Sequence, residues 1–205
     1  LVDATLGLGG HSYALLERFP KLKIIGIDRD KSAIAMAKER LATFGDRIQI
    51  AHSVFDQISE VVKSFGYQKI DGALFDLGVS SMQLDQKNRG FSYSQDAPLD
   101  MRMDQSQKLT ADEIINTWEP TELIKILRTY GEEKFAPRIV DAILENRPIK
   151  STAVLAQLVK NAIPAATRRT GGNPAKRTFQ ALRIAVNDEL GVISRALPQA
   201  LDSSQ

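Results

Sequence analysis

The chain has 205 residues, of which 43% are hydrophobic and 25% charged, and its formal net charge at pH 7 is +2. This composition is that of a globular protein, long enough for one good core and a small second lobe. The absence of cysteine excludes disulfides and thiolate metal sites, and the presence of only two histidines argues against a histidine-rich one, so no bound metal is expected. No segment has the apolar length of a membrane span, so we expect a soluble, cytoplasmic protein without a membrane partner.

Strand-like and helical patterns alternate along the first part of the chain. Four apolar runs indicate strands, at residues 2–5, 23–28, 48–51 and 72–77. Helical patterns separate them, at about 12–19, 31–43 and 55–65. This alternation is typical of βαβ units and predicts an α/β fold with a parallel sheet.

A glycine-rich loop, Gly7-Leu8-Gly9-Gly10-His11-Ser12, separates the first strand from the first helix. Such a loop lets the backbone approach a ligand and presents helix N-terminal N–H groups to it. It is similar to the dinucleotide fingerprint but carries Ser12 in place of the third glycine, as the shortened loop of S-adenosylmethionine enzymes does. A tight turn capped by Ser12 is the alternative, and His11 is not interpreted as catalytic.

Two residues that follow later strands are candidates for the same ligand. Asp28 ends the second strand, 19 residues after Gly9, close to the spacing at which an acidic side chain binds ribose hydroxyls. Asp30 is expected to cap the next helix. Phe55, just past the third strand, is positioned either to lie against an adenine ring or to fill the core, and both interpretations stay open.

Asp76 lies where the fourth strand meets a Gly/Ser loop, and ligands of open α/β sheets bind beyond the carboxyl ends of such strands. An exocyclic nucleobase amine is a poor nucleophile because its lone pair is delocalised into the ring. A carboxylate that accepts its N–H hydrogen bond localises that lone pair and offsets the positive charge developing during methyl transfer. The alternative is that Asp76 only holds a turn.

After the fourth strand the chain changes character. Residues 78–108 are polar and aperiodic, which predicts a functional loop rather than a core element. Helical patterns follow to about residue 197, with a capping box at 110–113, a helix opening at 119–121 and further helices at about 132–146, 151–162 and 176–197. We therefore predict an all-helical region after the sheet.

Positive charge is concentrated in this helical region. Residues 1–145 carry 18 Lys/Arg and 22 Asp/Glu, whereas residues 146–187 carry eight Lys/Arg and no acid. A block of one sign suggests a polyanionic partner, although a solvated surface loop is the alternative. The candidates for phosphate contact are Arg168, Arg169, Lys176 and Arg177. Arg183 and Asn187, four residues apart on one helix, are candidates for reaching a target base, or else form a solvated stripe.

Several segments together closely resemble the bacterial MraW/RsmH family, which methylates N4 of a cytidine in small-subunit ribosomal RNA. They are residues 76–85, 89–93, 98–104, 130–133 and 177–190. The resemblance covers essentially the whole chain and implies a Rossmann-like methyltransferase core with an all-helical insertion. The implied domains are a core at 1–108, an RNA-recognising insertion at 109–185 and a return towards the core at 186–205.

The resemblance also implies a role for individual residues. It places Gly9, Gly10 and His11 against S-adenosylmethionine at the loop, and Asp28 at its ribose. Phe55 would lie near the adenine, with Asp76 and Gln83 around the methionine end, and Asp76 also catalytic. The family's later strands are absent, so we expect the chain, apolar at Leu1 and polar at 201–205, to be a fragment at both ends.

These observations predict an S-adenosylmethionine-dependent RNA cytosine-N4 methyltransferase acting on small-subunit ribosomal RNA, free or in the assembled subunit. A nicotinamide-dependent oxidoreductase using the same glycine loop is one rival, against which Ser12 and the segment at Asp76 argue. A noncatalytic RNA-binding scaffold with the same fold is the other. The sequence leaves the oligomeric state open.

Overall fold

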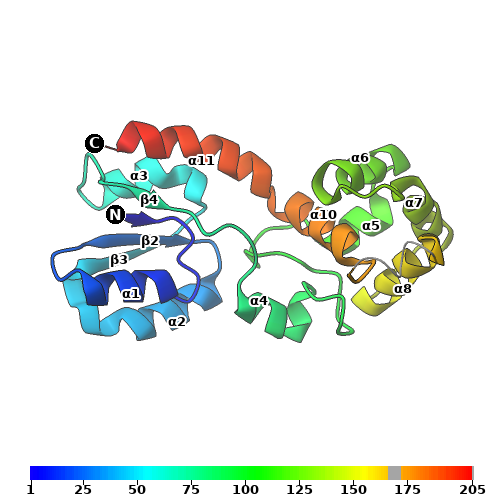
Figure 1. Cartoon of the computed structure of the whole chain (residues 1–205), viewed down its shortest axis with the longest axis horizontal. Coiled ribbons are helices and arrows are strands. Elements are labelled where there is room, and N and C mark those ends of the chain that lie inside the picture. The colour runs from blue at the N-terminus through cyan, green and yellow to red at the C-terminus, as the bar shows by residue number, and fades with distance from the viewer. Residues whose placement is uncertain (166–171, 205) are drawn as a thin grey trace. The chain divides into compact units, whose positions relative to one another are not determined.

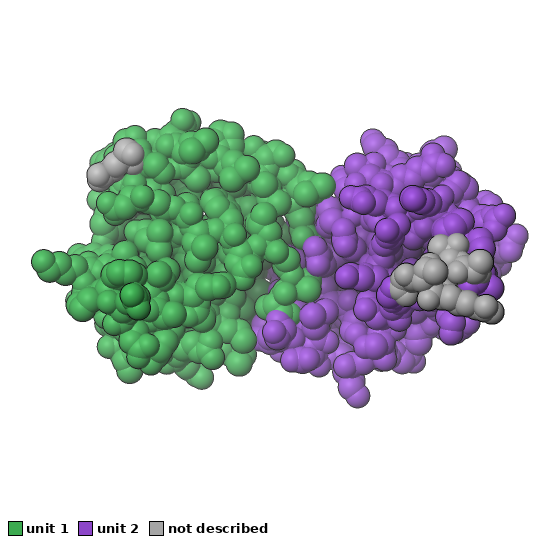
Figure 2. All heavy atoms as spheres, in the orientation of Figure 1, with its two compact units in different colours: residues 1–80, 189–205 green, residues 81–188 purple. Residues whose placement is uncertain are grey.

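The structure, a computed structural model, describes residues 1–165 and 172–204, and the chain forms two compact units. The first unit comprises Leu1–Ser80 and Glu189–Gln205, and the second comprises Ser81–Asp188 (Figure 2). The predicted boundaries differ from these, because residues 81–108 were assigned to the sheet-containing core but belong to the helical unit. That unit also extends to Asp188 rather than to residue 185.

A parallel sheet of four strands, ordered β3-β2-β1-β4, forms the centre of the first unit (Figure 1). The strands are β1 (Val2–Asp3), β2 (Ile24–Asp28), β3 (Ile48–His52) and β4 (Ala73–Leu74). In the register of the central strand, Val2 lies between Ile25 of β2 and Ala73 of β4. The chain adds β2 and β3 on one side of β1 and then returns to its other side, so the strand order reverses between β1 and β4. The predicted α/β fold with a Rossmann-like parallel sheet is confirmed.

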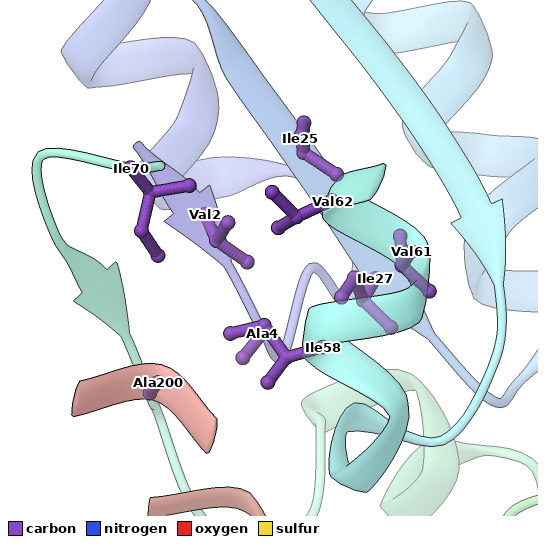
Figure 3. Packing of buried hydrophobic residues seen from close by; sticks show 9 residues of the cluster. All are labelled: Val2, Ala4, Ile25, Ile27, Ile58, Val61, Val62, Ile70 and Ala200. Carbon is purple, nitrogen blue, oxygen red and sulfur yellow. The ribbon is translucent and has the colours of Figure 1, made fainter. Parts of the chain in front are cut away.

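Helices cover both faces of this sheet: α1 (Gly10–Arg18) and α2 (Lys31–Leu41) on one, α3 (Ile58–Ser64) and α11 (Glu189–Ser203) on the other (Figure 1). Short 3₁₀ helices at Ala42–Arg47 and Phe55–Gln57 flank β3. Ile24 packs in a cluster with Leu16 and Leu41, whereas its neighbour Ile25 packs with Val62 in a second cluster (Figure 3). Successive side chains of a strand point to opposite faces, so both faces carry a hydrophobic core.

The predicted helix at 176–197 is wrong as one continuous element. Helix α10 (Lys176–Asn187) ends at Asp188, whose φ of 48° is left-handed, and α11 begins at Glu189. Aspartate tolerates this conformation better than most residues, and the Asp188 N–H caps the last turn of α10. The chain thereby returns to the first unit, where Ile70 N–H donates to the Ser203 carbonyl over 2.9 Å.

The second unit contains helices whose ends follow local sequence signals. They are α4 (Ser81–Asp85), α5 (Ala111–Thr117), α6 (Pro120–Gly131), α7 (Ala136–Glu145), α8 (Thr152–Ala162) and α10, with a 3₁₀ helix at Lys87–Arg89. Thr110 caps α5 as predicted, because its Oγ1 accepts from Glu113 N–H over 3.1 Å. Helices α6 and α10 pack closely, since a Cβ at Gly131 would lie 2.5 Å from the Arg177 carbonyl oxygen. No helix in the described part of the chain has the length and apolar character to span a bilayer.

Candidate functional site

The glycine loop lies between β1 and α1, and its geometry requires glycine at position 9. Gly9 has a φ of 75° and precedes the first residue of α1. A Cβ there would lie 2.9 Å from Cδ1 of Leu41, so the buried Leu41 side chain in α2 would have to shift to make room. Gly10 and His11, the first residues of α1, are exposed. The loop therefore presents helix N-terminal backbone to the edge of the sheet where β1 ends.

Ser12 does not have the capping role that was the alternative interpretation of the loop. The residue before α1 is Gly9, and Ser12 is fully buried, with its Oγ donating to Oδ2 of Asp3 over 2.7 Å. Asp3, only 1% exposed, also accepts from Thr5 N–H at Oδ1 over 3.3 Å. Burial raises the pKa of Asp3, and the hydrogen bonds from Ser12 and Thr5 offset part of that rise. Asp3 was not among the predicted site residues, although an acidic residue between apolar neighbours in a buried strand was a signal for it.

Asp28, at the end of β2, is tied to the glycine loop. Its Oδ2 accepts from Gly7 N–H over 2.7 Å, and its Oδ1 accepts from Asp30 N–H over 2.8 Å. Burial raises its pKa, and these backbone hydrogen bonds offset part of the rise. Asp30 caps α2 as predicted, because its Oδ1 accepts from Ser32 N–H over 3.0 Å. The carboxylate predicted to bind ribose therefore also positions the loop predicted to hold the same ligand.

Phe55 lies at the start of the 3₁₀ helix that follows β3. Its ring makes an edge-to-face contact with Phe75, with 5.6 Å between ring centroids. Both rings are partly buried against the core cluster that contains Ile58. Phe55 therefore has the core packing that was one of its two interpretations, and its contact with an adenine stays a prediction.

Asp76 lies two residues beyond the end of β4, with its side chain 66% exposed. Its Oδ2 lies 3.8 Å from Nδ1 of His11 in the glycine loop. Its backbone N–H donates to Oγ1 of Thr5 over 2.7 Å. Residues 71 positions apart thus meet at the carboxyl ends of β1 and β4, where the strand order reverses and where open α/β sheets bind ligands.

The first unit brings together most of the predicted donor site. Gly9, Gly10, His11, Asp28 and Asp76 all lie at the carboxyl ends of β1, β2 and β4. Within residues 1–165 and 172–204, no three His, Asp or Glu side chains are grouped to hold a metal ion. The arrangement provides backbone donors, a carboxylate already bonded to the loop, and an exposed carboxylate beside them.

Gln83 lies in the second unit, in α4, with only 6% of its surface exposed. Its predicted contact with the donor stays a prediction. The Asp100–Arg102 pair lies in the same unit and forms a local ion pair, with 2.7 Å between Nη2 and Oδ2. Arg102 donates to both carboxylate oxygens of Asp100, and its Nη1 donates to the Gln105 and Gln107 carbonyls.

The basic residues predicted to contact RNA differ in their surroundings. Lys176 and Arg177 open α10 and are exposed, and Nη1 of Arg177 donates to the Glu132 carbonyl over 3.1 Å. Arg183 is partly buried in the same helix. Arg168 and Arg169 lie outside the described residues.

Asn187 has a different role from the predicted RNA contact. It is only 3% exposed, and its Oδ1 accepts from Met103 N–H over 2.8 Å. Its Nδ2 donates to the Met101 carbonyl, also over 2.8 Å. Arg89 also binds the segment 101–103, because its Nη2 donates to the Arg102 and Met103 carbonyls. Asn187 therefore anchors residues 101–103 to the end of α10, and the alternative of a solvated stripe is wrong for this position.

Several curated proteins similar to this chain carry the name Ribosomal RNA small subunit methyltransferase H. The chain is 58% identical to the protein from Salinispora arenicola over 204 residues, covering 98% of this chain and 55% of the relative. It is 55% identical to that from Streptomyces avermitilis, covering 98% and 64%. It is 59% identical to that from Mycolicibacterium smegmatis, covering 98% and 55%. The chain thus spans between about half and two thirds of the length of these relatives.

The match to a family model covers nearly the whole chain. Residues 1–204 match the model of the MraW methylase family. Both units fall within that match, including the glycine loop and the segment at Asp76. The chain therefore belongs to the MraW methylase family.

Proposed function

We propose that this chain binds S-adenosylmethionine and supports methyl transfer to the N4 amine of a cytidine in small-subunit ribosomal RNA. The observation that carries the proposal is the exposed Asp76 carboxylate, 3.8 Å from His11 of the glycine loop. The shared name of the relatives supports the class of substrate. The resemblance to the family supports the donor and the target atom.

The residues of the first unit suit such a donor. Gly9 has no side chain, so the left-handed turn of the loop packs closely against Leu41, and Asp28 keeps lone pairs for ribose hydroxyls while its Oδ2 accepts from Gly7 N–H. Gly10 and His11 offer exposed groups at the start of α1, and Phe55 has a partly exposed ring near the end of β3. S-adenosylmethionine, when bound, supplies the activated methyl group.

Asp76 is placed to make the N4 amine of the acceptor a better nucleophile. A carboxylate that accepts a hydrogen bond from the N4 amine localises its lone pair and stabilises the positive charge that develops on nitrogen. The proton leaves the amine once the methyl group is attached, and Asp76 is the exposed group placed to accept it. Alignment of donor and acceptor then supplies much of the rate.

Cofactor choice and transfer are tested separately. In calorimetric titrations we expect the chain to bind S-adenosylmethionine and not NAD. Transfer of a labelled methyl group to unmodified small-subunit ribosomal RNA, naked and assembled, is then measured in the longest form of the protein that can be prepared. Preferential binding of NAD would overturn the proposal in favour of the oxidoreductase.

Asp76→Asn keeps the shape of the side chain and removes its charge. We expect it to reduce transfer by at least about a hundredfold with little change in RNA affinity. The matched control is Asp71→Asn, an exposed aspartate at the other end of the same strand segment. Full RNA affinity with no transfer by the wild-type protein would instead identify a noncatalytic scaffold.

A further inference from the structure

The hydrogen bonding between β1 and β4 changes immediately before Asp76. Val2 N–H donates to the Gly72 carbonyl and Ala4 N–H to the Leu74 carbonyl, both over 2.9 Å, as in a regular parallel ladder. In that register the next donor is Asp76 N–H and its acceptor is the Ala4 carbonyl. The Asp76 N–H instead donates to Oγ1 of Thr5, over 2.7 Å.

After Ala4 the chain that follows β1 bonds to β2 instead of to β4. Leu6 N–H donates to the Ile27 carbonyl on the β2 side, over 3.0 Å. This part of the chain is joined to the segment after β4 by the hydrogen bond between Thr5 Oγ1 and Asp76 N–H. The backbone of Asp76 is thus attached to the segment after β1 through a side chain rather than through a ladder hydrogen bond.

The backbone of Thr5 is in turn hydrogen-bonded to the side chain of Asp3. Oδ1 of the buried Asp3 carboxylate accepts from Thr5 N–H, and Oδ2 accepts from Ser12 Oγ in the first turn of α1. One carboxylate thus binds both Thr5, two residues before the glycine loop, and Ser12, the last residue of that loop. Because threonine is β-branched, its χ1 has few accessible values, which helps to keep Oγ1 directed at its donor.

We propose that Thr5 is a positioning residue whose hydroxyl sets the place of Asp76 relative to the glycine loop. The inference rests on the function proposed above, in which the Asp76 carboxylate meets the amine that receives the methyl group. The Asp76 side chain is exposed, so its position depends on how its backbone is held. Small displacements of a reacting group reduce rates steeply, because the reaction requires alignment.

The test uses two substitutions that differ in one group. Thr5→Val keeps the branched shape and removes the acceptor, whereas Thr5→Ser keeps the acceptor. We expect Thr5→Val to lower kcat by about tenfold or more, with KM for the methyl donor within about threefold of wild type. Thr5→Ser should retain kcat within about threefold. Thr43→Val, the same change at an exposed threonine of the first unit, is the matched control.

Hydrogen exchange at the Asp76 amide gives a second readout that needs no activity. The amide should be protected in the wild-type chain and in Thr5→Ser, and should exchange at least about tenfold faster in Thr5→Val. An unprotected wild-type amide, a kcat for Thr5→Val like that of Thr43→Val, or equal losses in Thr5→Val and Thr5→Ser would each overturn the inference. Absence of transfer by wild type with a protected Asp76 amide would count against the proposed function and leave the Thr5 bond established. If Thr5→Val does not fold, the wild-type amide and Thr5→Ser still decide the question.

Discussion

The carboxylate of Asp28 accepts a 2.7 Å hydrogen bond from the backbone N–H of Gly7, so the end of β2 holds the loop that follows β1. Its other oxygen accepts from Asp30 N–H at the start of α2. One side chain therefore joins two loops at the edge of the sheet where the donor is proposed to bind. A change at Asp28 should disturb the glycine loop as well as any contact with ribose.

Asp28→Asn should weaken binding of S-adenosylmethionine by roughly ten- to a hundredfold, the loss expected when charge-assisted hydrogen bonds of about 1.5–3 kcal/mol are disrupted. The amide NH₂ group of asparagine cannot accept from Gly7 or Asp30, so one backbone donor loses its partner. Calorimetric titration measures the affinity. Asp46→Asn, at an exposed aspartate of the same unit, is the control and should bind normally. Unchanged affinity in Asp28→Asn would contradict this role.

Asp3→Asn should change the pH dependence of stability in a defined direction. Burial raises the pKa of Asp3, so the folded state holds its proton more tightly than the unfolded state does. This contribution to stability is fully present below the unfolded pKa of about 3.9 and is lost as pH rises through the folded value. The variant should therefore become more stable relative to wild type as pH rises through that window. Urea unfolding of both proteins at several pH values measures the difference, and a pH-independent difference would contradict the prediction.

Gly9→Ala should destabilise the first unit by about 1–3 kcal/mol, because it combines a left-handed φ with a close contact to Leu41. The additional substitution Leu41→Ala removes the contact but not the backbone strain, so it should lessen the effect of Gly9→Ala without abolishing it. Unfolding free energies of the two single variants and the double variant give this coupling. Strict additivity would show that the contact with Leu41 costs nothing.

Asn187→Ala should destabilise the second unit by about 2–4 kcal/mol, because it leaves the partly buried Met103 N–H and the buried Met101 carbonyl without this partner. Asn161→Ala, on the exposed surface of α8, is the matched control and should change stability by about 0.5 kcal/mol or less. Thermal unfolding and hydrogen exchange at residues 101–103 measure the two effects. Similar small losses in both variants would show that Asn187 does not anchor the segment.

Replacing Lys176 and Arg177 together by Gln should weaken RNA binding and flatten its salt dependence by about 1.4 in the slope of log K against log salt, if each contacts one phosphate of single-stranded RNA. Both are exposed at the start of α10. Lys38→Gln with Lys63→Gln removes the same charge from the first unit and should leave the slope nearly unchanged. RNA affinity measured from low to moderate salt gives the slope for each double variant. Equal slopes for the two double variants would show that Lys176 and Arg177 do not contact RNA phosphates.

Local features of this protein were predictable because their signals span a few residues. The alternation of apolar runs and helical patterns indicated the parallel sheet, and the caps at Asp30 and Thr110 follow from side chains that reach backbone two or three residues away. The position of Asp76 after a strand was equally predictable, from the apolar run that precedes it. The family resemblance then assigned roles to positions that local patterns leave ambiguous, such as Phe55.

Other features depend on residues that only folding brings together. The bonds of Ser12 to Asp3 and of Asp76 to Thr5 join separate segments, and the burial of Asn187 depends on a loop 84 residues earlier in the chain. The left-handed Asp188 likewise interrupts a helical pattern that continues on both sides of it. Periodicity and residue type were therefore enough to predict most of the elements and the candidate role of the carboxylate after β4, because these signals are local. The backbone groups that hold that carboxylate and the polar side chains that are buried could be seen only in the folded chain, because both depend on contacts between distant segments.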